Sequence, residues 1–187
     1  LDSTLALIVA VEAFNINGYD KKGIHAITMP CYGTTDRTLN NARRLMEILE
    51  VTSYEINIKD ACEQHYKDIG YDKSKLDVTF ENVQARERTQ ILMDVSNKIG
   101  SLVVGTGDLS ELALGWCTYN GDQMSMYGVN ASIPKTLVRG ILESYAEHHE
   151  GLKDVLLDIC DTPVSPELLP PNEDGTIKQK TDIADLD

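Results

Sequence analysis

Residues 24–58 read IHAITMPCYGTTDRTLNNARRLMEILEVTSYEINI, and this stretch decides the fold. Its first apolar run, 24–30, is halted by Pro30 and predicts a short strand, and the alternation over 53–58 predicts another. The segment between them has the apolar spacing of a helix. Candidates for the N-terminal cap of that helix are Thr35, Asp36 and Thr38. A strand, a helix and a strand in this order favour a parallel pair of strands.

The same alternation continues on both sides of this stretch. Helices are predicted over 60–70 and over 82–99, the second stopping at Gly100, and SLVVG at 101–105 reads as a fully buried strand. The alternation predicts an α/β domain with a parallel sheet. Three more helices are expected near the ends: one from Asp2 or Ser3, one from about Ile133, and one over 151–160.

Composition limits the classes of function. The 187 residues suffice for one domain, and the net charge of −13 argues against binding of nucleic acid. No apolar stretch is long enough to span a membrane, and no signal peptide opens the sequence, so we expect a cytoplasmic protein. The acidic stretch 171–187 is predicted to be a loop or disordered. Four reduced cysteines are expected, at Cys31, Cys62, Cys117 and Cys160.

The exit of the strand at 101–105 is rich in polar groups, in the sequence GTGDLSELALGW of residues 105–116. Ligands bind beyond the carboxyl ends of strands in an open parallel sheet, and two glycines let the backbone approach them closely. Thr106 offers a hydroxyl there, and the Glu111 carboxylate is suited to Mg²⁺. Asp108 and Ser110 are suited to cap the next helix, and a plain capped helix without a ligand explains the residues about equally well.

Two further positions allow two interpretations each. Asp2 and Ser3 lie at a helix N-terminus, where the free N–H groups could hold a phosphate, although an ordinary cap is the commoner meaning. Lys135 also lies at a helix start, where a cation opposes the helix dipole. A neighbouring phosphate and simple solvation both explain that lysine.

Four blocks of sequence resemble one family. LDSTLALIVAVEAF, from Leu1, is similar to the end of SGGLDSxLA, the pyrophosphate-binding loop of N-type ATP pyrophosphatases. The other three blocks are more specific and resemble the synthetase domain of glutamine-dependent NAD synthetases, from residue 1 to about 170. They read NVQARERTQILMD at 82–94, GTGDLSELALGWCTYNGD at 105–122 and MSMYGVNASIPKTLVR at 124–139.

The resemblance implies a three-layer α/β fold with a parallel sheet of the adenine-nucleotide alpha-hydrolase-like kind, its first strand absent from this chain. It implies one domain over 1–170 that amidates deamido-NAD to NAD, with ATP and Mg²⁺, through an adenylated nicotinate. Ammonia would come from glutamine through an amidase domain that this chain lacks. The resemblance also implies a homo-oligomer. It implies no nucleic acid or membrane partner.

The resemblance assigns roles by matched position. Metal ligands would be Asp2 and Glu111, and catalytic residues would be Asp122 and Lys135. The ATP site would include Leu1, Asp2, Ser3, Met29, Thr106 and Lys135. The deamido-NAD site would include Asn82, Arg86, Glu111, Trp116, Cys117, Thr118 and Tyr119, with Cys117 not acting as a nucleophile.

Three other functions stay open at this stage. Another N-type ATP pyrophosphatase, such as a GMP synthetase, would carry a different block in place of GWCTYNGD at 115–122. A tRNA-thiolating enzyme would use paired cysteines or a basic face. The third possibility is an inert nucleotide-binding or dimerising fragment, because only Leu1, Asp2 and Ser3 of the pyrophosphate loop are present.

Overall fold

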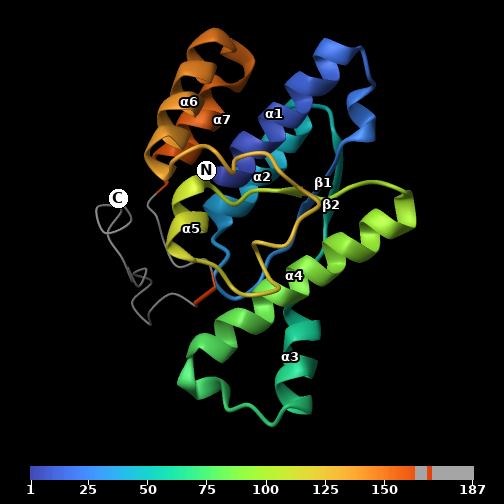
Figure 1. The fold of residues 1–187 in the computed structure, drawn as a ribbon, viewed down its shortest axis with the longest axis vertical. Coiled ribbons are helices and arrows are strands. Elements are labelled where there is room, and N and C mark those ends of the chain that lie inside the picture. Colours follow the sequence, from blue (N-terminus) through green and yellow to red (C-terminus); the bar gives the residue numbers. More distant parts are fainter. Residues whose placement is uncertain (163–167, 170–187) are drawn as a thin grey trace.

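The computed structural model describes residues 1–162 and 168–169, so the predicted acidic tail at 171–187 lies outside the described residues. Helices and strands alternate through the first two thirds of the chain, except that two helices follow each other between residues 59 and 99 (Figure 1). The strands are β1 (His25–Thr28), β2 (Thr52–Glu55), β3 (Val104–Gly105) and β4 (Tyr127–Gly128). The α-helices are α1 (Asp2–Asn17), α2 (Asp36–Ile48), α3 (Lys59–Asp68), α4 (Val78–Ile99), α5 (Leu109–Leu114), α6 (Lys135–His148) and α7 (Glu150–Cys160). Two short 3₁₀ turns lie at Lys21–Gly23 and Lys73–Lys75.

All four strands pair in parallel, which confirms the predicted α/β class. β1 pairs with β2 in the register His25 to Thr52, and α2 forms the crossover between them. β3 pairs with β4, Val104 opposite Tyr127. The hydrogen bonds of the described residues thus join the strands as two parallel pairs.

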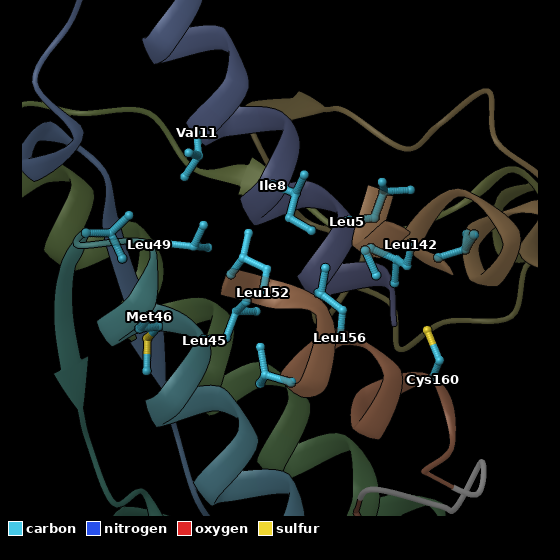
Figure 2. Packing of buried hydrophobic residues seen from close by; sticks show 14 of the residues in the cluster. Leu5, Ile8, Val11, Leu45, Met46, Leu49, Leu142, Leu152, Leu156 and Cys160 are labelled. Atoms are coloured by element: carbon cyan, nitrogen blue, oxygen red, sulfur yellow. The ribbon is translucent and has the colours of Figure 1, made fainter. Parts of the chain in front are cut away.

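The larger hydrophobic core lies between α1, α2, α6 and α7 (Figure 2). The apolar run at the start of α1 buries Leu5 and Ile8 against side chains of the other three helices, including Leu45 and Leu156. Each such side chain contributes about 1.5–3 kcal/mol through the apolar surface that it removes from water. This packing fixes the N-terminus of α1 next to α6, which positions the site described below.

A second core holds α3 against the first half of α4. The rings of Tyr66 and Phe80 stack with centroids 5.5 Å apart, and the buried Tyr66 hydroxyl donates to the Phe80 carbonyl at 2.7 Å. The same cluster contains Cys62 and Leu169. It anchors the N-terminal half of α4, from which Asn82 and Arg86 project.

Several local predictions are confirmed and others are wrong. Thr35 caps α2 and Gly100 ends α4 in the left-handed conformation, as expected. Asp2 and Ser3 do not cap α1, because the helix already begins at Asp2, with Leu1 as its N-cap. The strand at 101–105 is not fully buried: its hydrogen-bonded part is two residues long, and Val104 is 37% exposed.

The short strand β4 was not predicted. The segment between α5 and α6 has no strand pattern in its sequence, yet Tyr127–Gly128 pairs with β3. All four cysteines have free thiols, as predicted. Within the described residues, no helix combines the length and the apolar character needed to cross a membrane.

Candidate functional site

The N-termini of α1, α5 and α6 meet at the exit of β3. Figure 1 shows the N-terminus of the chain between α5 and α6. Two backbone-level contacts hold the helix starts together: the Leu109 N–H donates to the Ile133 carbonyl at 2.9 Å, and the Lys135 N–H donates to Ser110 Oγ at 3.1 Å. Because three helix starts converge, their side chains share one small volume.

Three carboxylates occupy this volume. One oxygen from each of Asp2, Asp108 and Glu111 lies within 4.8 Å of the others. Asp108 and Glu111 form a capping box at the start of α5, in which each side chain accepts a hydrogen bond from the other's backbone N–H. We call this set of three side chains the carboxylate cluster.

The ammonium of Lys135 lies among the three carboxylates. Its Nζ is 2.7 Å from Asp2 Oδ2, 2.9 Å from Glu111 Oε1 and 3.2 Å from Asp108 Oδ2. Three carboxylates thus face one ammonium, and the cluster keeps a formal excess of negative charge. From the sequence, solvation and a neighbouring phosphate both explain Lys135, and the structure adds these acidic partners as a third explanation.

Burial and charge act in opposite directions on the groups of the cluster. Burial raises the pKa of the Glu111 carboxyl above its ordinary value, and the Lys135 ammonium opposes this only in part. Burial would lower the pKa of Lys135, but the carboxylates of Asp2 and Glu111 raise it more, so the net shift is upward. Lys135 therefore stays charged at neutral pH, whereas an additional cation would favour the ionised form of Glu111.

Asn130 connects the two halves of this site. Its side chain is only 1% exposed, and Nδ2 donates to the Asp2 carbonyl at 2.9 Å and to the Thr106 carbonyl at 3.1 Å. The start of α1 and the exit of β3 are therefore tied to one amide. Sequence reasoning missed Asn130, whose only signal was its place in the block at 124–139.

Residues of α4 contact the loop that follows α5. The Thr118 hydroxyl donates to Asn82 Oδ1 at 2.8 Å, and Arg86 Nε donates to the Tyr119 carbonyl at 3.1 Å. The Thr118 backbone N–H donates to Asp122 Oδ1 at 2.9 Å. Five of the residues predicted for deamido-NAD or catalysis thus lie together between α4 and the loop that follows α5.

The aromatic residues of this loop do not serve as core packing. Trp116 is 54% exposed and Tyr119 is 73% exposed. Cys117 is exposed as well and contacts Gln123 through its thiol. Exposed rings beside the hydrogen-bonded pair of Thr118 and Asn82 are suited to stacking on a planar ligand.

Comparison with known proteins decides among the families that the sequence left open. A sequence model described as NAD synthase matches residues 1–155. The chain belongs to the NAD synthase family. The glutamine-dependent NAD(+) synthetase of Mycobacterium leprae is 47% identical over 178 residues, which are 91% of this chain and 26% of the relative. The protein of the same name from Mycobacterium tuberculosis H37Rv is 46% identical over 182 residues, which are 93% of this chain and 27% of the relative.

A solved structure agrees with this assignment. The glutamine-dependent NAD+ synthetase of Acinetobacter baumannii, in complex with ADP, superimposes with a TM-score of 0.75 at 30% identity. The match covers 88% of this chain and 30% of that protein. The predicted adenine-nucleotide alpha-hydrolase-like fold is therefore confirmed. This member of the NAD synthase family spans about a quarter of the length of the curated relatives that it matches.

The remaining predicted ATP residues of this NAD synthase-family chain lie at the exits of two strands and at the start of α1. Leu1 is the N-cap of α1, Ser3 is exposed on its first turn, and Thr106 follows β3. Met29 lies elsewhere, at the exit of β1, where it packs against the second core and its carbonyl accepts a hydrogen bond from Arg88 at 3.2 Å. The structure thus brings the start of α1 and Thr106 together through Asn130, whereas Met29 contacts the second core and Arg88.

Proposed function

We propose that residues 1–170 form an ATP pyrophosphatase domain that amidates deamido-NAD to NAD. The observation that carries the proposal is the convergence of Asp2 and Glu111 at the exit of β3, in a chain of the NAD synthase family. In the first step, the nicotinate carboxylate of deamido-NAD attacks the α-phosphate of ATP and releases pyrophosphate. In the second step, ammonia attacks the activated carbonyl and AMP leaves as NAD forms.

The side chains of the cluster fit Mg²⁺ as a metal for this reaction. All its donors are carboxylate oxygens, which this hard cation prefers, and Asp2 Oδ1 is buried without a hydrogen-bond partner. Asp2 and Glu111 would hold the ion. When bound, Mg²⁺ neutralises charge that develops on the phosphate oxygens.

The residues of the chain would bind and orient the ATP phosphates. The free N–H groups at the start of α1, beside Leu1 and Ser3, favour an anion. Thr106 adds a hydroxyl at the strand exit, and the Lys135 ammonium adds a positive charge that its pKa keeps at neutral pH. These positive groups would stabilise the pentacoordinate phosphorus of the first step, because they are in place before it forms. Met29, directly after β1, would border the adenine of ATP.

The surface between α4 and the loop after α5 would bind deamido-NAD. Trp116 and Tyr119 supply exposed rings for stacking on the nicotinate. The Thr118 hydroxyl donates to Asn82, so its oxygen would accept a hydrogen bond from the ligand. Asn82 and Arg86 hold this loop in place through their hydrogen bonds. Cys117 would line the site without acting as a nucleophile. Asp122 would attract the incoming ammonium ion through its carboxylate.

The remaining partners follow from the family. We propose that ammonia reaches the site from glutamine, because the relatives reported above are named glutamine-dependent. Exposed apolar residues on α6, Leu137 and Ile141 among them, would form a contact between copies in a homo-oligomer. Four free thiols fit a reducing compartment, and we propose the cytoplasm.

The proposal is tested by supplying Mg²⁺, ATP, deamido-NAD and ammonium to the full-length protein and measuring AMP and NAD. Equal amounts of both products are expected, and their formation should depend on all four components. Binding of deamido-NAD in titration calorimetry without release of AMP would contradict the proposal. That result would indicate a nucleotide-binding module that cannot turn over.

A further inference from the structure

Asp108 belongs to the carboxylate cluster but has no part in the metal pair proposed above. Its side chain is 0% exposed, and its two oxygens are used unequally. Oδ1 accepts the Glu111 backbone N–H at 2.9 Å, whereas Oδ2 is buried without a hydrogen-bond partner, 3.2 Å from Lys135 Nζ. Buried polar atoms are nearly always hydrogen-bonded, whereas this oxygen has only its ion-pair contact with Lys135 and faces two other carboxylates, an arrangement that points to a ligand.

The charges of the cluster lead to the same conclusion. Three carboxylates surround one ammonium, which leaves a formal excess of two negative charges in a partly buried volume. Such an excess is unfavourable where water is scarce. A divalent cation in place of the ammonium would reduce this excess from two negative charges to one, and Asp108 Oδ2, which makes no hydrogen bond, would be available to bind it.

Lys135 occupies the place that such a cation needs. Its Nζ lies within 3.2 Å of an oxygen from every member of the cluster. An ammonium and a divalent cation repel each other strongly at such short separations, so both cannot keep these contacts. The ammonium stands at the start of α6, where the helix dipole opposes it, and the carboxylates hold it there.

We propose that Asp108 is the third carboxylate of the cation site and that Lys135 is the counter-ion that a divalent cation must displace from it. The inference rests on the proposed function, since it refines the metal site of that reaction. Asp108 then has two tasks, with one oxygen on the helix cap and the other on the cation. Displacement frees the Lys135 ammonium for the triphosphate, so that metal binding and phosphate binding are coupled.

The test measures binding of Mn²⁺ alone, without nucleotide, from the electron paramagnetic resonance signal of the free ion. The Asp108→Asn variant should bind Mn²⁺ about tenfold more weakly or worse, because a charged ligand is lost. The Lys135→Met variant should bind it about tenfold more tightly, because the competing charge is gone. The metal-free Lys135→Met protein should also melt at a lower temperature than the wild type, and saturating Mn²⁺ should restore that temperature.

Matched variants separate these effects from changes in the fold. Asp77 caps α4 through the same type of bond that Asp108 makes, so Asp77→Asn controls for the cap. Lys73 pairs with Glu63 outside the site, so Lys73→Met controls for loss of a lysine. Neither control should change Mn²⁺ affinity by more than about twofold. If Asp108→Asn does not fold, Asp108→Ser retains a good N-cap and lacks the charge.

The inference would be overturned by wild-type affinity in both Asp108 variants, or by unchanged or weaker binding in Lys135→Met. Absence of Mn²⁺ binding by the wild type would do so too. None of these results bears on AMP formation by the same preparation, which tests the proposed function separately. Tight Mn²⁺ binding with the expected variant effects, but without AMP formation, would support the inference and contradict that function.

Discussion

Replacing Asn130 by alanine should destabilise the protein by an amount that its two hydrogen bonds determine. The buried Nδ2 donates to the Asp2 carbonyl at 2.9 Å and to the Thr106 carbonyl at 3.1 Å. A typical intramolecular hydrogen bond contributes about 1 kcal/mol net, so the free energy of unfolding should fall by about 2 kcal/mol. For a chain of this length, that loss lowers the melting temperature by about 4–8 °C.

The assay is urea unfolding followed by circular dichroism. An unchanged slope of unfolding free energy against urea concentration would show that the wild type and the variant expose the same surface on unfolding. Asn97→Ala is the matched control, since Asn97 is exposed on α4 and alanine is a better helix former. It should show no loss of stability. Asn130→Asp should lose more than Asn130→Ala, because a carboxylate would face two carbonyl oxygens.

The amide of Asn130 also fixes Asp2 relative to the exit of β3, so its loss should affect the metal site. Affinity for Mn²⁺ should fall in Asn130→Ala although the variant keeps all three carboxylates of the cluster. A loss of stability below about 0.5 kcal/mol would refute the view that these two bonds hold the halves of the site together. Asn130→Asp with wild-type stability would refute it too.

Three other changes test separate parts of the structure. Glu111→Gln should reduce release of pyrophosphate by about 100-fold or more and leave the circular dichroism spectrum unchanged, since glutamine can keep the capping bond; unchanged turnover would remove Glu111 from the metal site. Trp116→Ala should weaken deamido-NAD binding in calorimetry more than ATP binding, and equal losses would indicate a packing role. The pKa of Asp158 is lowered by its hydrogen bonds and ion pair with Arg37, so this stabilisation is present above the ordinary carboxyl pKa of 3.8 and is lost as the pH falls through the lower folded value. Asp158→Asn should therefore flatten the acid side of the stability curve, and a curve that keeps the wild-type slope there would contradict the assignment.

Local signals in the sequence were sufficient for most helices. Gly100 predicted the end of α4 because only a residue without a side chain readily adopts the left-handed conformation there. Thr35 was one of three candidate caps for α2, and the structure selects it. These features depend on a few neighbouring residues, so a pattern of types along the chain suffices to find them.

Features set by distant residues were not predictable in the same way. β4 has two residues, too few for a periodic pattern, and exists because the backbone at 103–105 lies beside it. Val104 was expected to be fully buried, but the strand's only hydrogen-bonded neighbour in the described residues is β4, and the side chain is partly exposed. Neither outcome is encoded near the residue concerned.

The carboxylate cluster shows where local and distant information meet. From the sequence, a capped helix and a ligand site were alternative interpretations of Asp108 and Glu111. The structure shows that the capping box takes only one oxygen of each carboxylate, Asp108 Oδ1 and Glu111 Oε2. The other oxygens, Asp108 Oδ2 and Glu111 Oε1, face Lys135. The two interpretations are therefore compatible. The cap fixes the orientation of each carboxyl group, and that orientation directs its second oxygen toward the Lys135 ammonium. The stability of α5 and the geometry of the site thus depend on the same two side chains.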